Sequence, residues 1–487
     1  MNLRPHQELA KDLLRQSFAK GNKRIILGAP CSFGKTITSV SIALDAVAKG
    51  RKVMFICDRV KLVEQSIRAF DNAGIEIGVI QAQSERINPK AMIQIASIQT
   101  LARRIKYRMP EFDLAIVDEC QTHYKATQAM MDRYSNVGFI GLSATPFSKG
   151  LGLAYQDLVV PITPEELMSQ GYLTKVDYYA GASVDVKSIK SRGMSTGGTD
   201  FDPKSLGKAT EDDNVLTGDI IKNWMTHAKD KMTIAFSPSI KHSKYLVGEF
   251  NKVGVSAVHI DGYMSEEERE IIYQAHENGE FLILSCSMLL SVGYDSPKVE
   301  CMIDCYPTKS LILYVQRAGR IMRTAEGKER AIYLDHAGNI QRHEMFPEEV
   351  VPETLDDGES RYNEKSLTKK EKKESKPKEC PKCHSIMKGL RCICGYEYPI
   401  SEVIETTPEI LQKLDKYSMD QKMEFYAGML RIGIDKNYSK GWAYYAYKEK
   451  FGVFPNKRPE PAVKPCEDAV KFAKYKQIRY AKGRNKV

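Results

Sequence analysis

The feature that most constrains the fold of this chain is a regular alternation of short apolar runs with amphipathic segments. Between Lys23 and Pro146, apolar runs of four to six residues are too short for independent helices and predict buried strands. These strands are Arg24–Leu27, Val53–Cys57, Ile77–Ile80, Met92–Ala96, Leu114–Val117 and Gly138–Leu142. Helical patterns over Lys35–Lys49 and Val60–Asn72 lie between them. Such alternation predicts a doubly wound parallel sheet.

A second series of the same kind begins near residue 214. Its predicted strands are Thr233–Phe236, Ala257–Ile260, Phe281–Ser285, Val299–Ile303 and Ala331–Leu334, with helices over 240–252, 265–277 and 309–323. We therefore expect two α/β domains, over 1–170 and 171–346, with a loop-rich insertion at 187–214. The remaining chain divides into a charged linker (347–379), a cysteine-rich segment (380–400) and a helical region (401–487).

The first strand leads into a candidate phosphate-binding loop. Its residues are Ala29, Pro30, Cys31, Ser32, Phe33, Gly34, Lys35 and Thr36. A Gly-Lys-Thr triplet alone is common by chance, but here a strand precedes it and a helix follows it. Backbone N–H groups would hold phosphate at the helix N-terminus, Lys35 would neutralise its oxygens, and the Thr36 hydroxyl would hold Mg²⁺.

Two carboxylates follow another predicted strand. Asp118 and Glu119 come directly after Leu114–Val117, so they would lie at the edge of the sheet beside the phosphate loop. Asp118 would then hold Mg²⁺, and Glu119 would orient or deprotonate the attacking water. The alternative interpretation is an ordinary acidic turn. The phosphate loop about 80 residues earlier in the chain argues against this alternative.

A third group is basic. On the helix predicted over 309–323, Gln316, Arg320 and Arg323 are spaced to share one face. Periodicity alone favours a basic surface helix. The presence of a nucleotide site in the first domain favours a pair of arginines that reach across a cleft to the γ-phosphate.

Four of the eleven cysteines are clustered. They are Cys380, Cys383, Cys392 and Cys394, in a Cys-x2-Cys and Cys-x-Cys arrangement. Four thiolates at this spacing predict a tetrahedral structural Zn²⁺, with disulfides or an iron–sulfur cluster as alternatives. A metal site of this kind would supply folding energy to so small a segment.

The positive charge of the chain is concentrated near its end. The net charge is +10, and residues 431–487 alone contain 15 Lys and Arg against 5 Asp and Glu. Aromatic residues, among them Trp442, Tyr445 and Phe454, alternate there with lysines. Rings with cations are typical of a surface for single-stranded nucleic acid, although the same rings could form the core of a small helical domain.

Other classes of protein are excluded. The N-terminal residues contain no apolar signal-peptide core, and the most apolar stretch, 281–290, is too short to span a membrane. Scattered cysteines in a long chain argue against a disulfide framework. We expect a cytoplasmic protein of a bacterial or phage-infected cell, associated with the nucleoid.

The motifs together resemble those of superfamily 2 DExH-type helicases, in order, over residues 3–345. The resemblance implies two RecA-like domains that bind ATP and Mg²⁺ between them. It implies a base contact from Gln7 beside Arg4, and nucleotide contacts from Gly293 and Asp295. It also implies that Ser143–Pro146 couples hydrolysis to domain movement. The nucleic-acid contacts that it implies are Arg59, Gln99, Thr100, Phe236, Ser237 and Ser291.

Three positions depart from the family pattern. Ala29 replaces a common glycine, Gln121 stands where many relatives have histidine, and Ser291-Val292 replaces a more usual Thr-Glu pair. The cysteine cluster and the segment Lys440–Pro455 are similar to the C-terminal region of RadD-type DNA-repair helicases and related phage proteins.

We therefore expect an ATP-dependent helicase or translocase on DNA, acting in repair, recombination or replication. A single-strand-binding, repair or replication protein is a possible partner. The alternatives are an RNA helicase with the same motor, and a zinc-dependent scaffold whose motor is vestigial.

Overall fold

The computed structural model describes most of the chain. The described residues are 3–57, 60–72, 74–81, 84, 86–104, 110–122, 124–181, 186, 189–194, 199–209, 214–287, 294, 296–343, 345–357, 378–379, 386–387, 411–413, 419–436, 438–439, 441–451, 455, 458–470, 472–474 and 476. Among them, no helix combines the length and apolarity that a membrane crossing requires.

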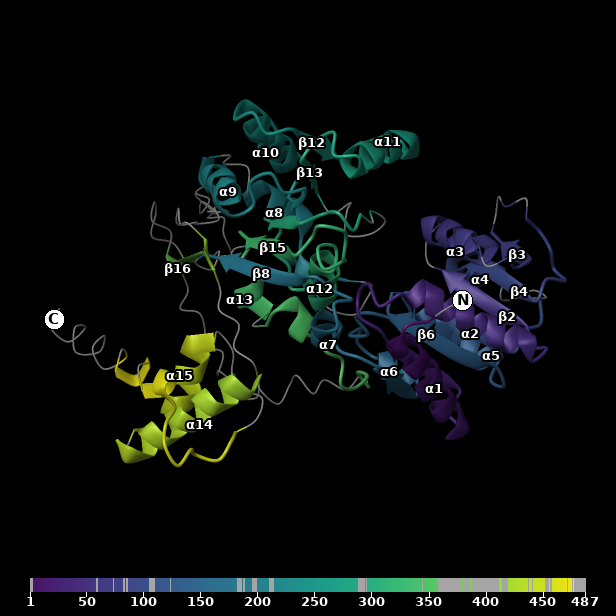
Figure 1. The fold of residues 1–487 in the computed structure, drawn as a ribbon, viewed down its shortest axis with the longest axis horizontal. Helices are drawn as coiled ribbons and strands as arrows, with labels where there is room; N and C mark the ends of the chain where they lie inside the picture. Colours follow the sequence, from purple (N-terminus) through teal and green to yellow (C-terminus); the bar gives the residue numbers. More distant parts are fainter. Residues whose placement is uncertain are drawn as a thin grey trace.

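The first domain is built on a seven-stranded parallel sheet of order β3-β4-β2-β5-β6-β1-β7 (Figure 1). Its strands are β1 (Arg24–Gly28), β2 (Val53–Cys57), β3 (Ile77–Ile80), β4 (Ile93–Ser97), β5 (Leu114–Val117), β6 (Gly138–Ser143) and β7 (Asp157–Val159). Its helices are α1 (Pro5–Ala19), α2 (Lys35–Ala48), α3 (Val60–Asn72), α4 (Ile98–Arg104), α5 (Tyr124–Arg133), α6 (Leu151–Ala154) and α7 (Pro164–Ser169). Buried apolar residues on both faces of the sheet explain why its strands read as continuous apolar runs.

The second domain has a seven-stranded sheet of order β12-β13-β11-β14-β15-β8-β18, parallel except for β18. Its strands are β8 (Lys175–Ala180), β11 (Thr233–Phe236), β12 (Ala257–Ile260), β13 (Ile283–Cys286), β14 (Cys301–Asp304), β15 (Arg330–Asp335) and β18 (Gln412–Lys413). Its helices are α9 (Asn214–His227), α10 (Ile240–Lys252), α11 (Glu266–Glu277), α12 (Leu311–Ala318) and α13 (Asn339–His343). The two parallel α/β sheets confirm the predicted fold class at this level.

Two parts of this domain differ from the sequence prediction. β8 joins the sheet well before residue 214, where the second series was expected to begin. The insertion contains a hairpin of β9 (Ser191–Gly193) and β10 (Thr199–Phe201), followed by α8 (Pro203–Ala209). Aromatic Phe201 is buried at 2% exposure, so part of the insertion is packed against the domain.

The region after residue 400 forms a smaller unit of its own. Helices α14 (Met419–Asp435) and α15 (Trp442–Phe451) pack around an apolar cluster that includes Phe425, Met429 and Tyr447. Most aromatic rings described here therefore contribute to a core, although Tyr445 is 63% exposed. β18 attaches this end of the chain to the second sheet, because it pairs with β8 and Leu411 N–H donates to Asn223 Oδ1 (2.8 Å).

The four clustered cysteines lie outside the described residues. Two short strands around the first pair are described, β16 (Lys378–Glu379) and β17 (Ile386–Met387), and they pair antiparallel with Glu379 opposite Ile386. Cys380 and Cys383 come between these two strands in the sequence.

Candidate active site

The phosphate loop lies between β1 and α2 and contains two residues in the left-handed region. Gly34, at the start of α2, has φ +91°, and Ser32 has φ +63°. A side chain at Gly34 would meet Gln7 Nε2 at 2.3 Å, so glycine is required there. Lys35 Nζ lies 3.4 Å from the backbone oxygen of Ala29, which holds its ammonium group over the loop.

The start of α1 packs against this loop. Gln7 is buried, and its Nε2 donates to the backbone oxygen of Phe33 (3.1 Å), while its Oε1 accepts from Arg4 N–H (2.9 Å). The Arg4 guanidinium lies 4.7 Å from the centre of the Tyr172 ring. His6 packs between Phe33 and Tyr172, and burial lowers the pKa of His6. Arg4 and Gln7, both predicted from the sequence, thus lie beside the phosphate loop.

Motif residues Asp118 and Glu119 follow β5 at the same edge of the sheet. Glu119 has φ +45°, which is unusual for a side chain with a Cβ, and its N–H donates to Asp118 Oδ1 (3.0 Å). Glu119 Oε2 accepts a hydrogen bond from Gln121 Nε2. This backbone conformation and these two contacts fix the direction in which the Glu119 carboxylate points.

The segment Ser143–Pro146 connects the phosphate loop with the acidic residues. β6 lies between β1 and β5, so this segment leaves the sheet between them. Ala29 N–H donates to Ser143 O (2.9 Å), and Cys120 N–H donates to Leu142 O (3.1 Å). Gln121 is fully buried, and its backbone oxygen accepts from Ser148 Oγ (2.7 Å). At the histidine position of many relatives, Gln121 thus links the acidic motif to the segment after β6.

The second domain reaches this site through α12. Gln316 Nε2 donates to Glu119 Oε2 across the domain boundary (3.2 Å). Gly319, directly after α12, lies so close to the phosphate loop that an added Cβ would be 2.7 Å from both Cβ and Sγ of Cys31. A cavity of about 20 Å³ between the domains, lined in part by Pro30, Val315 and Gly319, has room for a single water molecule.

The helix that bears the basic motif is shorter than predicted. α12 ends at Ala318, so Arg320 and Arg323 lie in the turn that follows it. The prediction that they share a helical face with Gln316 is therefore wrong, because the chain leaves the helix at Gly319. Arg320 Nη1 donates to the backbone oxygen of Tyr294, and Tyr294 is buried against Tyr273 and His276.

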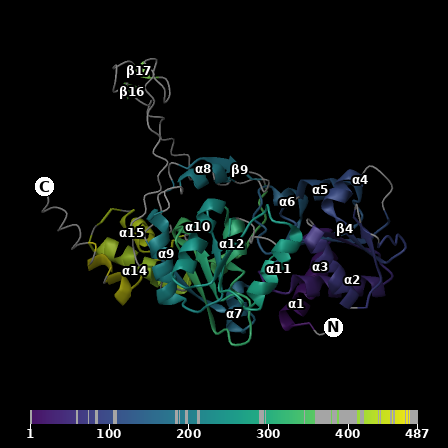
Figure 2. The same cartoon turned by 90° about the horizontal axis from the view of Figure 1, so that it is seen from above.

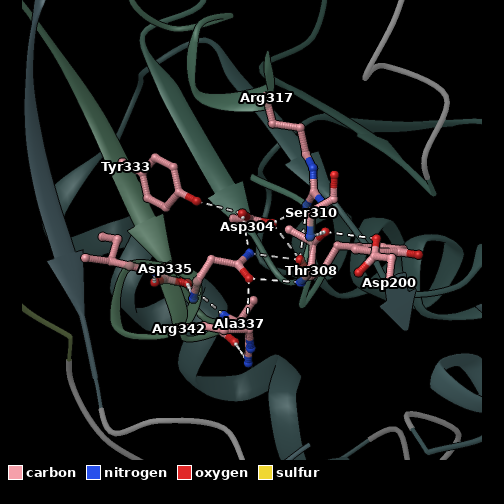
Figure 3. A network of polar contacts seen from close by, with 12 residues as sticks. Asp200, Asp304, Thr308, Ser310, Arg317, Tyr333, Asp335, Ala337 and Arg342 are labelled. Carbon is pink, nitrogen blue, oxygen red and sulfur yellow. Dashed lines mark hydrogen bonds and ion pairs between the residues drawn. The ribbon is translucent and has the colours of Figure 1, made fainter. Parts of the chain in front are cut away.

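A buried polar network supports α12 from below (Figure 3). Arg317, only 1% exposed, donates to Asp304 Oδ1 (3.0 Å), and the Tyr333 hydroxyl donates to Asp304 Oδ2 (2.6 Å). Asn339 Nδ2 donates to the same Asp304 oxygen (2.8 Å). Asp335 is adjacent to Asp304 in the sheet, and burial together with that charge raises the pKa of Asp335 to about 6.

Residues 347–357, which we name the strap, cross from the second domain back to the first. Glu348 is buried and bonds to the Tyr178 hydroxyl in the second domain. At the other end, Asp356 Oδ1 accepts from Gly150 N–H (2.8 Å), and Asp356 O accepts from Gly152 N–H (2.7 Å). Part of the predicted charged linker is therefore an ordered connection between the two domains.

Of the residues predicted to contact nucleic acid, some are accessible in the structure, some are buried, and others lie outside the described residues. Gln99 is exposed on α4, and Thr100 is half-buried behind it, bonded to Ser97. Phe236 and Ser237 are buried at 1% and 0% exposure, in the core of the second domain, so the structure does not offer them to a strand. Arg59, Ser291, Gly293 and Asp295 lie outside the described residues.

The residues present fit a magnesium nucleotide. Ser32 and Gly34 have left-handed backbone conformations in this loop, and the buried Ser32 hydroxyl has no hydrogen-bond partner among the described residues. Lys35 would be the cation for the phosphates. Thr36 and Asp118 are the oxygen donors that would hold Mg²⁺, one after β1 and the other after β5.

Two family models match the chain. Residues 1–148 match the res subunit of type III restriction enzymes, and residues 217–325 match the helicase conserved C-terminal domain. Among curated relatives, a 51.5 kDa protein of Lactococcus phage (isolate 7-9) is 26% identical over 401 residues, covering 80% of this chain and 82% of that protein. A protein of Schizosaccharomyces pombe named as a mitochondrial ATP-dependent helicase, irc3, is 24% identical over 70% of this chain and 58% of its own length. The chain thus spans less than two thirds of that yeast relative.

Solved structures share the fold. A fragment described as an HsdR subunit of a type I restriction enzyme from Vibrio vulnificus YJ016 has a TM-score of 0.55 at 18% identity, covering 73% of this chain and 66% of that chain. The ATP-dependent type ISP restriction-modification enzyme LlaBIII, in a structure bound to DNA, has a TM-score of 0.52 at 20% identity, covering 69% of this chain and 27% of that chain.

The first domain contributes a phosphate loop and an acidic pair, and the second contributes a glutamine–arginine segment. This combination is that of an ATP-hydrolysing enzyme. The matched helicase domain, the restriction-enzyme model and the relatives named as ATP-dependent helicases support an ATP-hydrolysing superfamily 2 helicase.

Three tyrosines of this site were missed by the sequence reasoning. Tyr172 faces Arg4, while Tyr273 and Tyr294 stack with ring centres 4.9 Å apart. Tyr172 and Arg4 are far apart in the sequence, so no local pattern signals their contact. Tyr294 is within the segment that resembles a helicase motif, and its buried neighbours explain why an aromatic residue fits there.

Proposed function

We propose that this chain couples ATP hydrolysis to movement on DNA, or to its remodelling, in repair, recombination or replication. The observation that carries the proposal is the hydrogen bond from Gln316 in the second domain to Glu119 in the first (3.2 Å). Because one carboxylate contacts both domains, a change at the nucleotide alters how the domains meet. Such a change can move two nucleic-acid-binding surfaces relative to each other.

The residues of the site have distinct roles in this scheme. Lys35 binds the phosphates, and Glu119 orients or deprotonates the attacking water. Arg320 and Arg323 stabilise the charge that develops on the transferring phosphoryl group. Mg²⁺ held by Thr36 and Asp118 would neutralise phosphate charge. Gln316 would orient Glu119 only while the domains are closed.

DNA is favoured over RNA by two comparisons. The first family model is that of a restriction-enzyme subunit, and LlaBIII shares the fold in a structure that is bound to DNA. Both statements concern other proteins, and an RNA helicase with the same motor is the alternative.

The test is ATP turnover in the presence of single-stranded DNA, duplex DNA, branched DNA or RNA. We expect stimulation by at least one DNA and little by RNA. Stimulation by RNA alone would overturn the DNA assignment, and an absence of ATP turnover would favour the vestigial-motor scaffold.

We also propose a structural Zn²⁺ held by Cys380, Cys383, Cys392 and Cys394, as in RadD-type helicases. Four thiolates at this spacing suit the ion, and the described strands β16 and β17, which pair with each other, come directly before and shortly after the first two cysteines in the sequence. Purified protein should contain about one zinc per chain. Cys383→Ser should lose the metal, whereas Cys466→Ser, remote in sequence, should keep it. Full zinc content in Cys383→Ser would contradict the ligand set.

The basic end of the chain is proposed as an accessory nucleic-acid contact. Deletion from residue 375 onward should weaken binding and reduce its salt dependence, because phosphate contacts release counterions. Affinity equal to that of the full chain would reject this role.

A further inference from the structure

The hairpin in the insertion presents a set of exposed cations. Lys190 precedes β9, Arg192 is within it, Lys204 is in α8, and Lys309 lies beside them before α12. Within the described part of the chain, none of these four side chains forms an ion pair. The Lys309 ammonium instead contacts Ser191 Oγ (2.5 Å) and lies 4.6 Å from the Phe201 ring centre. We name Lys190, Arg192, Lys204 and Lys309 the hairpin surface.

The hairpin that carries this surface is firmly anchored. Asp200, only 3% exposed, accepts from Lys309 N–H (2.7 Å) and from the Thr308 hydroxyl (2.9 Å). Its Oδ1 also accepts from Phe201 N–H (2.8 Å). A buried carboxylate with three donors is costly to displace, so the exposed strand β9 is held in a fixed place.

The hairpin surface lies on one side of the molecule with elements of the first domain. Figure 2 shows α8 and β9 on the same side as α6, α5 and α4, whereas α1 and α7 lie on the opposite side. α4 carries the exposed Gln99 and, in its last turn, exposed Arg103 and Arg104. The elements that carry these exposed cations therefore lie on the same side of the two domains.

We propose that the hairpin surface binds the sugar–phosphate backbone of a nucleic acid strand that also passes α4 of the first domain. This inference rests on the proposed function and extends it to a contact site in the second domain. Cations that lack acidic partners attract a polyanion, and the rigid anchor lowers the entropic cost of binding. The four residues offer charge and not stacking, so the contact reads phosphate and not base sequence.

The anchor also connects this surface to the ATPase site. Asp200 bonds to Thr308 and Lys309, directly before α12, and α12 carries Gln316. Thr308 N–H donates to Asn339 Oδ1 (3.0 Å), and Asn339 bonds to Asp304 beneath the helix (Figure 3). A nucleic acid strand bound at the hairpin surface would therefore be connected, through Asp200, to the polar network that positions α12.

The experiment compares two triple variants of the full chain. Lys190→Ala, Arg192→Ala and Lys204→Ala are combined in one, and Lys20→Ala, Lys49→Ala and Lys229→Ala, exposed cations elsewhere, are combined in the control. Affinity for a single-stranded oligonucleotide is measured by fluorescence anisotropy at several salt concentrations. We expect the hairpin variant to flatten the slope of log affinity against log salt by about 2, at roughly 0.7 per phosphate contact. ATP turnover without nucleic acid should be unchanged.

Equal slopes for the two triple variants would overturn the proposal. Failure of the unmodified chain to bind any nucleic acid would instead overturn the proposed function, so the two failures are distinguishable. Arg192→Glu provides a second variant, and because Arg192 lies opposite Asp200 in the β9–β10 pair, unchanged thermal stability of this variant is required to show that the anchor is intact. Arg192→Glu should weaken binding of the oligonucleotide more than Arg192→Ala does. An unchanged affinity in both variants would also reject the hairpin surface as a binding site.

Discussion

At the scale of single residues, Glu119 has the most demanding position in the molecule. Its backbone has φ +45°, and its Oε2 accepts from Gln121 within its own domain and from Gln316 in the other. A carboxylate held by two amide donors keeps one orientation, which a base that acts on a single water requires. In the proposed function this side chain would act on the attacking water and would contact Gln316 only while the domains are closed.

Glu119→Gln tests the chemical role. The amide has nearly the same size but cannot take a proton, so we expect ATP turnover to fall by about 10²–10⁴-fold while nucleotide binding is retained. Steady-state ATPase assays and binding of a fluorescent ATP analogue separate these effects. The exposed Glu267→Gln on α11 is the control. Turnover within a factor of about two of the parent would show that another residue is the base.

Lys35→Ala should instead reduce nucleotide binding. Its ammonium group lies over the loop through its contact with Ala29, so its loss removes the principal cation for the phosphates. The same two assays apply, with Lys90→Ala as an exposed control. Undiminished binding together with undiminished turnover would mean that this loop is not the nucleotide site.

The contact between α12 and the phosphate loop belongs to the scale of elements. Gly319→Ala would place a Cβ 2.7 Å from Cys31 and force the two elements apart. Because misplacement by about 1 Å can cost up to 10²-fold, we expect turnover to fall roughly 10- to 100-fold with thermal stability preserved.

The double variant Cys31→Gly with Gly319→Ala supplies the control for this prediction. It removes the two Cys31 atoms that the new Cβ would meet at 2.7 Å, leaves only the Val315 carbonyl oxygen at 3.3 Å, and should restore part of the lost turnover. No recovery in the double variant would mean that Gly319 acts through its backbone conformation and not through this close approach.

The elements also show what sequence reasoning can and cannot reach. Apolar runs predicted β2, β3, β5, β11 and β12 to the residue, since buried parallel strands are apolar on both faces. β8 was missed although Val176, Tyr178 and Ala180 alternate inward, because its other residues include Lys175 and Asp177. The three-residue strands β9 and β10 have no periodicity that could be recognised. Their position depends on the contacts of Asp200, more than 100 residues away from Thr308.

For the candidate site as well, the sequence predicted some residues and the structure was needed for others. Local motifs identified Lys35, Asp118 and Glu119, because a phosphate loop and an acidic pair are continuous in sequence. The partners that complete the site, such as Tyr172 beside Arg4, come together only through the tertiary fold. The end of α12 also required the structure, because periodicity continued through Gly319 whereas the close approach to Cys31 did not allow the helix to do so.

At the scale of the whole molecule, acid should destabilise the second domain more than the first. Burial lowers the pKa of His276 and His343 to about 4 and that of His336 to about 3. Their folded-state pKa values lie below the unfolded value near 6.5, so their stabilisation is complete above pH 6.5 and declines as the pH falls toward 4. Asp335, with its pKa raised to about 6, opposes this in part, because it gains a proton more readily when folded.

Between pH 7.5 and 5.5 we expect a loss of about 1 kcal/mol in unfolding free energy for each of the three histidines. Urea denaturation at both pH values measures it. His276→Gln should be less stable at pH 7.5 but should lose less between the two pH values than the parent. An equal loss would show that His276 is protonated in the folded chain.

The strap sets a mechanical limit on the motor. Its ends are fixed to different domains, at Tyr178 through Glu348 and at Gly150 through Asp356. The eight residue steps from Glu348 to Asp356 span roughly 27 Å when fully extended, so the Cα atoms of these two residues cannot separate beyond that distance. Lys422 in α14 also pairs with Glu349 of the strap (3.2 Å), so the strap contacts the helical unit as well as both domains. While both contacts persist, the length of the strap therefore limits how far the cleft between the two domains can open.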